Sequence, residues 1–365
     1  MTPRDTASLK IVTVVGARPQ FIKAAALRAA IETIPEMHEV LVHSGQHYDR
    51  NMSDVFFEEL GMRPPEHRLA VGGRRHGAMT GRMLEEIEAI LIAEAPDATL
   101  VYGDTNSTLA GALAAAKLNI PVIHVEAGLR SFNRSMPEET NRVLTDQLSD
   151  LLFCSTETSV RNLAREGIAR GVHMVGDIMY DVALMHGAKA DRTALKRLYA
   201  SDDRPLALLT LHRAENFGSA ARAARVLDFV ARQTRTHDIL FPIHPGTRAK
   251  LAALGLAIPD GVRVTDPLPY GTLQGLIGIA ELVLTDSGGL QKEAYFHRTP
   301  CITLRDETEW VETIEAGWNA LWTAPVHGPR REIPEYGTGD TARRILDVIR
   351  RELPAIHAAR DPAPA

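Results

Sequence analysis

The sequence lacks the features that mark secreted, membrane-spanning and metal-binding proteins. It has two cysteines, Cys154 and Cys301, and each lies in an apolar segment typical of a strand. We therefore expect two buried thiols rather than a disulfide, which fits the reducing cytoplasm. No apolar run reaches the ~20 residues that span a bilayer, and the N-terminus lacks the apolar core of a secretion signal. These absences predict a cytoplasmic protein with no membrane partner.

Motifs for metals and dinucleotides are also missing. The histidines, cysteines and acids show no metal-ligand spacing, and no Asp-x-Asp motif occurs. The turn after the first apolar run contains no Gly-x-Gly-x-x-Gly fingerprint, so the sequence does not support bound NAD. A net charge of −5 argues against a nucleic-acid partner. We predict no metal, no cofactor and no nucleic acid.

The chain alternates short β-branched runs with longer helical patterns, in two series. The first series covers residues 11–15, 39–44, 98–103, 120–125, 150–154 and 171–176, and the second covers 206–211, 238–243, 261–265, 281–286 and 300–304. Strands that alternate with helices at this spacing form βαβ units and a parallel sheet. A chain of 365 residues also exceeds the usual size of one hydrophobic core. We therefore predict an α/β fold with two doubly wound domains.

The domain boundaries follow from the same pattern. We place the first domain at residues 1–181 and the second at 182–344. The helical, polar stretch 182–204 is the expected connection, and residues 339–360 are expected to form a terminal helix.

Two acids come directly after apolar strands of the first series. Asp104 follows the run at 98–103 and Glu126 follows the run at 120–125. The carboxyl ends of parallel strands line the crevice where ligands bind, so the pair indicates proton chemistry or recognition of hydroxyl groups. Asp104 alternatively caps the helix that follows it. Glu126 precedes no clear helix, which leaves it fewer structural explanations.

The turn after the first strand is a candidate anion site. In the segment 16–27, Gly16 permits a tight turn, Pro19 suits the first helical position, and Arg18 and Lys23 flank the helix start. The alternative is that both cations are surface residues beside an ordinary turn.

The second half of the chain repeats this arrangement. Ser287, Gly288 and Gly289 follow the strand at 281–286, and their N–H groups can approach a diphosphate closely. Glu293 lies one turn into the next helix, where a carboxylate can hold ribose hydroxyls. A serine N-cap followed by a helix-favouring glutamate is the alternative. Turns of this type in both domains predict a nucleotide in the cleft between them.

Further candidates lie at other strand and helix ends. His212 ends the first strand of the second series, and His244 directly follows the next one. His212 is either functional or a structural histidine, and the role of His244 stays open. Glu138 and Glu139 begin a helix after Pro137, where acids also complement the helix dipole.

Eight segments in order resemble the non-hydrolysing UDP-N-acetylglucosamine 2-epimerases. They lie between Ile11 and Asn319 and read GARPQFIK, GQHYD, GDTNS, EAGLRS, MPEETNR, LHRAENF, TDSGGLQKEA and TLRDETEW. The resemblance implies a glycosyltransferase-B-like architecture of two Rossmann-like domains around a central cleft. It also implies a C-terminal helix, at about 345–360, that packs back on the first domain, and a homodimer.

The resemblance also implies a reaction that interconverts UDP-GlcNAc and UDP-ManNAc for envelope polysaccharide synthesis. UDP leaves by anti elimination across C1–C2, giving a 2-acetamidoglucal, and then adds back after protonation of C2 from the opposite face. This route needs a base, an acid and a site for the diphosphate, but no redox cofactor.

Residue by residue, the resemblance assigns roles to this sequence. The catalytic residues would be Asp104, Glu126, Glu138 and His212, with the choice of base and acid left open. The contacts to the nucleotide sugar would come from Arg18, Lys23, Leu273, Ser287, Gly288, Gly289 and Glu293. His212 would assist the departing phosphate, and Leu273 would pack on the uracil.

Three departures from the family pattern bear on the substrate. Trp310 stands where the family commonly has a ligand-binding arginine, and the segment between Glu126 and Glu138 is short. Both leave open a sugar with a 3-acetamido group or a C6 carboxylate. Asp49 stands where members activated by a second UDP-GlcNAc often have glutamine. We therefore predict weak or absent activation of that kind.

Three other functions remain as alternatives at this point. A hydrolysing 2-epimerase would release free ManNAc and UDP, whereas a glycosyltransferase on the same fold would transfer the sugar without exchange at C2. A non-catalytic binding module is disfavoured, because several carboxylates beside a diphosphate would repel it.

Overall fold

The computed structural model describes residues 8–46, 57–73, 75–201 and 204–360. The chain divides into two compact units, of which the first comprises Met1–Val182 and Pro334–Ala365 and the second Ala183–Ile333. The return to the first unit begins before the terminal helix, because the N–H of Asp177 donates to the carbonyl of Tyr336 at 3.1 Å.

The first unit contains, within the described residues, a seven-stranded parallel sheet in the order β3-β2-β1-β4-β5-β6-β7. Its strands are β1 (Leu9–Val15), β2 (Met37–His43), β3 (His67–Arg68), β4 (Ala98–Tyr102), β5 (Val122–Val125), β6 (Leu151–Cys154) and β7 (Val172–Met174). The strand order runs outward in both directions from β1 and β4, which pair with each other. This reversal is the topological switch point of a doubly wound fold.

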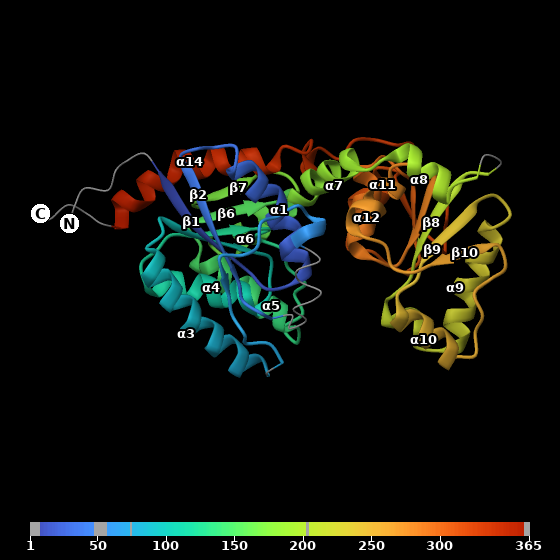
Figure 1. The fold of residues 1–365 in the computed structure, drawn as a ribbon, viewed down its shortest axis with the longest axis horizontal. Helices are drawn as coiled ribbons and strands as arrows, with labels where there is room; N and C mark the ends of the chain where they lie inside the picture. The colour runs from blue at the N-terminus through green and yellow to red at the C-terminus, as the bar shows by residue number, and fades with distance from the viewer. Residues whose placement is uncertain (1–7, 47–56, 74, 202–203, 361–365) are drawn as a thin grey trace, which may run out of the picture. The chain divides into compact units, whose positions relative to one another are not determined.

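Helices cover both faces of this sheet (Figure 1). They are α1 (Arg18–Ile31), α3 (His76–Glu94), α4 (Asn106–Lys117), α5 (Pro137–Leu148), α6 (Glu157–Arg165), α7 (Ile178–Lys189) and α14 (Thr341–Arg360), with α7 running into the second unit. Successive side chains of a strand point to opposite faces. Val12 and Val14 of β1 accordingly pack with buried residues of α3 and α4, such as Met83 and Ala110.

The second unit contains, in its described part, a six-stranded parallel sheet in the order β10-β9-β8-β11-β12-β13. Its strands are β8 (Leu206–Thr210), β9 (Asp238–Pro242), β10 (Val262–Thr265), β11 (Leu282–Thr285), β12 (Cys301–Thr303) and β13 (Asn319–Leu321). The switch point lies between β8 and β11, which pair in parallel. The predicted fold class, with two Rossmann-like doubly wound units, is confirmed.

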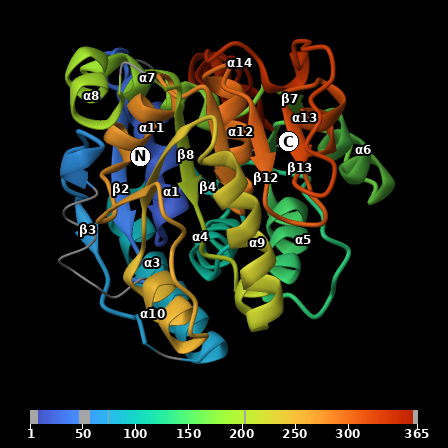
Figure 2. The ribbon, with the colours of Figure 1, turned by 90° about the vertical axis from the view of Figure 1, so that its right-hand side faces the viewer.

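The alternation of side chains along β8 divides the helices of this unit between two faces. The helices are α8 (Arg192–Tyr199), α9 (Ala220–Gln233), α10 (Pro245–Ala253), α11 (Tyr270–Ile277), α12 (Gly288–Phe296) and α13 (Val311–Glu315). Ala207 and Leu209 pack in a core with α9 and α10, whereas Leu206 and Leu208 pack with α8, α11 and α12. Figures 1 and 2 both show α11 and α12 side by side.

The two cysteines are free and buried, as predicted. Burial raises the pKa of the Cys154 thiol to about 12, so the thiol stays protonated at neutral pH. Among the described residues, none of the helices combines the length and the hydropathy needed to cross a membrane.

Candidate functional site

Asp104 lies in the turn between β4 and α4, but it does not cap that helix. The N-cap is Thr105, whose side chain accepts a hydrogen bond from the N–H of Thr108. The Asp104 carboxylate instead pairs with Arg142 of α5, with 2.5 Å between Oδ2 and Nη2. The capping explanation for this acid is therefore wrong.

Glu126 lies in the turn after β5 and pairs with Lys23. Its φ of 72° is in the left-handed region, which is uncommon for a residue other than glycine. The turn is held because the N–H groups of Glu126 and Ala127 both donate to the carbonyl of Phe153. Backbone strain of this kind clusters at functional sites, where the surrounding structure over-determines it.

The two acids share one electrostatic environment. A Cβ on Gly103 would lie 3.3 Å from Oε2 of Glu126 and 3.8 Å from Nζ of Lys23, so this pair sits against the Asp104 turn. Burial raises the pKa of Asp104, Arg142 lowers it and Glu126 raises it, and the net result is a raised pKa. A carboxyl with a raised pKa beside a carboxylate held by a lysine provides groups for proton transfer.

Lys23 itself lies six residues into α1 and is buried. The sequence placed it beside the start of the helix as an anion ligand, but the structure shows it as the ion-pair partner of Glu126. Arg18 occupies the first position of the same helix and is exposed.

The structure distinguishes the two adjacent glutamates of α5. Glu138 is exposed, and among the described residues no hydrogen bond or ion pair joins it to Asp104 or Glu126. Glu139 is buried, and its carboxylate accepts hydrogen bonds from the N–H of Ser131 (2.9 Å) and the N–H of Phe132 (2.9 Å).

Glu139 also contacts the guanidinium that holds Asp104, with 3.0 Å between its Oε2 and Nη1 of Arg142. Burial raises the pKa of Glu139, but hydrogen bonds from Ser131, Phe132 and Arg142 outweigh burial and lower it overall. Arg142 is not among the residues predicted from the sequence. Its position one helical turn after Glu138 and Glu139 indicates an ion pair with them, but only tertiary packing brings Arg142 to Asp104.

A buried histidine supports the Asp104 turn from behind. His124 of β5 lies 2.7 Å from the carbonyl of Gly103 through Nε2 and 2.7 Å from Oδ1 of Asp146 through Nδ1. Asp146 also pairs with Arg130 at 2.7 Å. Since a carbonyl only accepts, Nε2 carries a proton and the ring fixes the Gly103 carbonyl in place.

His212 follows β8 at the carboxyl edge of the second sheet, and Asp286 fixes its backbone. The buried Asp286 carboxylate accepts from the N–H groups of His212 and Arg213, each at 3.0 Å, and from Nδ2 of Asn216 at 3.0 Å. The His212 side chain is 53% exposed, with Nδ1 3.3 Å from Asp286. Asp286 was not singled out from the sequence, although it directly follows β11 much as Asp104 follows β4.

Ser287 is the N-cap of α12, and its Oγ accepts from the N–H of Leu290 at 3.4 Å. Gly288 and Gly289 form the first turn of this helix. The first N–H groups of a helix have no partner within it, so a capping serine and an anion site are compatible here.

Glu293 and Leu273 lie on the neighbouring helices α12 and α11. Glu293 is buried, and its carboxylate accepts from Nε2 of Gln274 at 2.7 Å and from the hydroxyl of Tyr270 at 3.4 Å. Leu273 is half-buried at the edge of the core formed by α8, α11 and α12.

Trp310 lies at the N-cap of α13, near the same helix. The buried Lys292 of α12 holds its Nζ 4.0 Å from the centroid of the indole ring. His244 caps α10 locally, since its Nδ1 accepts from the N–H of Gly246 at 3.1 Å. Asp49 lies outside the described residues.

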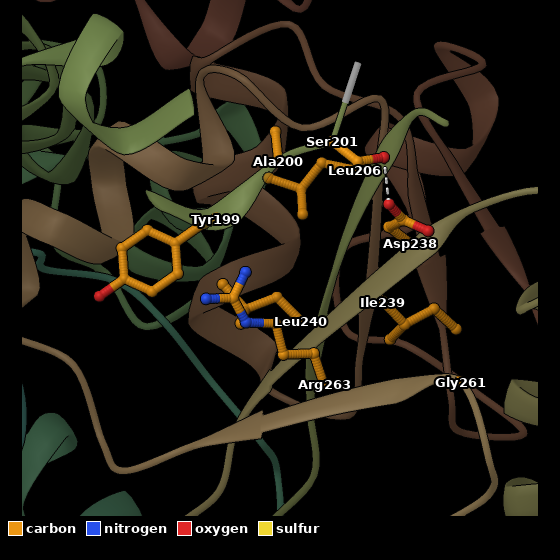
Figure 3. Close-up of a pocket in the computed structure, with 9 residues that line it drawn as sticks. All are labelled: Tyr199, Ala200, Ser201, Leu206, Asp238, Ile239, Leu240, Gly261 and Arg263. Atoms are coloured by element: carbon orange, nitrogen blue, oxygen red, sulfur yellow. Dashed lines mark hydrogen bonds between the residues drawn. The ribbon is translucent and has the colours of Figure 1, made fainter. Parts of the chain in front are cut away.

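Figure 3 shows a pocket of about 150 Å³ in the second unit, and none of these residues lines it. Asp238 and Leu206, at the amino ends of β9 and β8, line it together with Tyr199 and Arg263. His212 and Ser287 follow the carboxyl ends of their strands, so this pocket is at the opposite edge of the sheet. Ligands of doubly wound folds bind at the carboxyl edge, and we do not assign the pocket to the site.

These features define the class of protein as an α/β protein of two Rossmann-like units, with acids, a histidine and a glycine turn at the carboxyl edges of the sheets. The family model for UDP-N-acetylglucosamine 2-epimerase matches residues 29–350. The chain belongs to this enzyme family, which confirms the resemblance found in the sequence.

Two relatives illustrate the range of named substrates. The chain is 46% identical over 357 residues to UDP-2,3-diacetamido-2,3-dideoxy-D-glucuronate 2-epimerase of Pseudomonas aeruginosa, a match that covers 93% of this chain and 99% of that protein. It is 43% identical over 324 residues to UDP-N-acetylglucosamine 2-epimerase of Methanocaldococcus jannaschii, covering 86% of this chain and 88% of the relative.

Solved structures of the M. jannaschii enzyme share the fold. One superposes with a TM-score of 0.83 at 38% identity, covering 94% of this chain and 99% of the other. Another, in complex with UDP-GlcNAc and UDP, gives a TM-score of 0.77 at 39% identity with the same coverage.

Proposed function

We propose that the protein epimerises C2 of a UDP-activated 2-acetamido sugar, with UDP-GlcNAc and UDP-ManNAc as the first pair to test. The observation that carries this proposal is the cluster at the first sheet edge, where Asp104 and Glu126 lie close to each other and pair with Arg142 and Lys23. Two carboxyl groups in different environments supply the acid and the base that inversion at C2 requires.

The proposed reaction begins with removal of the C2 proton by one carboxylate. The electrons of the C2–H bond form the C1=C2 double bond, and the C1–O bond breaks so that UDP leaves with its electron pair. In the second half of the reaction, an oxygen of UDP attacks C1. The electrons of the C1=C2 double bond then take up a proton at C2, on the face opposite to the one that lost the proton. The raised pKa of Asp104 suits the acid, which leaves Glu126 as the base in the direction from UDP-GlcNAc.

The departing diphosphate needs positive charge and N–H donors. We assign this role to Arg18 and to the turn formed by Ser287, Gly288 and Gly289, with His212 assisting the leaving phosphate. His212 is well placed for such a role because Asp286 fixes its backbone while its ring stays exposed.

The remaining assignments concern the nucleoside and the sugar. Glu293 is proposed to hold the ribose hydroxyls and Leu273 to contact the uracil, which agrees with their positions on the adjacent helices α12 and α11. Glu138 is proposed to act on the sugar, a role that is compatible with its exposed side chain.

A second candidate substrate is the 2,3-diacetamido glucuronate derivative of the UDP-sugar. The 46% identity to an enzyme named for that substrate favours it. Trp310 is consistent with a modified sugar, because it stands where the family commonly has a ligand-binding arginine.

Product analysis distinguishes these functions. The purified protein is incubated with UDP-GlcNAc and, separately, with the diacetamido glucuronate derivative, and products are followed by NMR. We expect one substrate to give its C2 epimer as an intact UDP-sugar. Release of free ManNAc and UDP would indicate a hydrolysing epimerase, and turnover only with an added acceptor would indicate a glycosyltransferase.

We also propose that the enzyme acts as a homodimer in the cytoplasm. The free, buried thiols fit a reducing compartment. Light scattering on the purified protein tests the oligomeric state, since a monomeric mass across the micromolar range would contradict it.

A further inference from the structure

The space beside the glycine turn of α12 holds a carboxylate of the protein itself. A Cβ on Gly288 would lie 2.6 Å from Oε1 of Glu309, a distance that real Cβ atoms do not show. Because glycine has no side chain, the Glu309 carboxylate can occupy this space beside Gly288. This carboxylate comes from the loop between β12 and α13.

Two arginines converge on the same carboxylate. Nη1 of Arg305 lies 2.6 Å from Oε2 of Glu309, and Nη2 of Arg213 lies 3.6 Å from Oε1. Arg213 also approaches Gly288, with 3.6 Å from Nη2 to the position of the absent Cβ. A negative group thus already sits among two guanidinium groups at the N-terminus of a helix, which is an environment suited to an anion.

Arg305 has unused capacity to bind a ligand. It is buried, and its Nε has no hydrogen-bond partner among the described residues. The Glu215 carboxylate lies 3.9 Å from that atom, which is too far for a hydrogen bond. A buried donor without a partner is unfavourable, so an acceptor that reached it would be bound favourably.

We propose that Glu309 is an internal competitor that occupies the anion position of this turn and is displaced by the diphosphate of UDP. This inference rests on the proposed function of the turn as the diphosphate site. A carboxylate and a diphosphate of like charge cannot share the two arginines without mutual repulsion. The Glu309 side chain is 43% exposed, so it is free to move into solvent when the ligand enters.

Competition from Glu309 lowers the affinity of the site for every ligand that carries the diphosphate. Substrate, product and UDP are affected alike, which is uniform binding in the terms of enzyme kinetics. Replacement of Glu309 by glutamine should therefore lower the Kd for UDP and the KM together by about two- to fivefold, as expected for an exposed charge interaction. The value of kcat should stay the same or fall.

Calorimetric titration with UDP tests the proposal with three proteins: the wild type, E309Q and the control E307Q. Glu307 is exposed on the same loop, so its replacement removes the same charge without touching the arginines. We expect tighter binding for E309Q and unchanged binding for E307Q.

Two outcomes would overturn the proposal. Weaker or unchanged binding by E309Q, with a wild type that binds UDP, would show that Glu309 positions the arginines or does nothing, and the proposed function would stand. A wild type that does not bind UDP would overturn the proposed function, and this inference with it.

Discussion

Replacing Arg142 by glutamine should destabilise the first unit in a pH-dependent way. The guanidinium joins Asp104 at 2.5 Å and Glu139 at 3.0 Å, so R142Q leaves two partly buried carboxylates without their cation. Breaking a fully buried pair costs about 3–5 kcal/mol. The Arg142 and Asp104 side chains keep 17% and 27% of their exposure, so we expect a smaller loss of about 1–3 kcal/mol at pH 7.

The sign of the pH dependence follows from the pKa shifts. Folding raises the pKa of Asp104, so the folded protein favours the protonated carboxyl. The contribution of Asp104 to stability therefore falls as the pH rises from its pKa in the unfolded chain toward its pKa in the folded protein. Removing Arg142 raises this pKa further and deepens the loss at neutral pH. The pKa of Glu139 is lowered by folding, partly by Arg142, and that stabilisation is present above the unfolded pKa and lost in acid. Both effects make R142Q most harmful at neutral pH.

Thermal unfolding of the wild type and R142Q at pH 4 and pH 7 measures this difference. The control is R161Q, which breaks an exposed pair between Arg161 and Glu157 in the same unit. We expect a clear loss of Tm for R142Q at pH 7, a smaller loss at pH 4, and little change for R161Q at either pH. An equal loss for R142Q at both pH values, or one no larger than that of the control, would refute the reasoning.

Three further predictions concern named side chains. D104N and E126Q should each lower kcat by about 10²–10⁴-fold while UDP affinity measured by calorimetry is kept, and unchanged turnover would contradict their roles. E138Q should lower kcat without changing Tm, whereas E139Q should lower Tm as well, because only Glu139 anchors the Ser131–Phe132 backbone. A thiol reagent should label Cys154 only after unfolding, since the thiol is buried and stays protonated, and rapid labelling of the folded protein would disagree.

The sequence located the strand ends well because long apolar runs fix where a buried strand stops. Asp104, Glu126 and His212 each follow such a run, and each lies at a carboxyl edge in the structure. The strands that were missed lack this signal. β3 consists of His67–Arg68 alone, and β13 reads Asn-Ala-Leu, so neither shows a β-branched run.

The contacts among site residues could not be predicted in the same way. Arg142 meets Asp104 only because α5 packs against α4, and Lys23 meets Glu126 from the interior of α1. Such pairs join residues far apart in the chain, and local patterns carry no information about them. The sequence therefore located Asp104 and Glu126 after their strands, but it did not indicate that Arg142 and Lys23 form ion pairs with them.

The point at which the chain returns to the first unit also depends on long-range contacts that local sequence patterns do not show. The sequence placed the end of the second domain at 344, on the basis of the terminal helix. In the structure Asp181 accepts from the N–H groups of Thr341 and Ala342, at 3.1 and 2.8 Å, so α14 is tied to the first unit from its first turn. A carboxylate at the start of a helix is favourable there, but its origin 160 residues earlier could not be read from the pattern.

Isotope exchange at C2 of the sugar directly tests the proposed proton transfer. Wild-type protein is incubated with UDP-GlcNAc, or with the diacetamido glucuronate derivative if that is the substrate, in D₂O, and the C2 proton is followed by NMR. We expect deuterium to enter C2 of the intact UDP-sugar in step with epimerisation, and E126Q to slow both to the same extent. Epimerisation with full retention of the C2 proton would contradict the proposed proton transfer by Asp104 and Glu126.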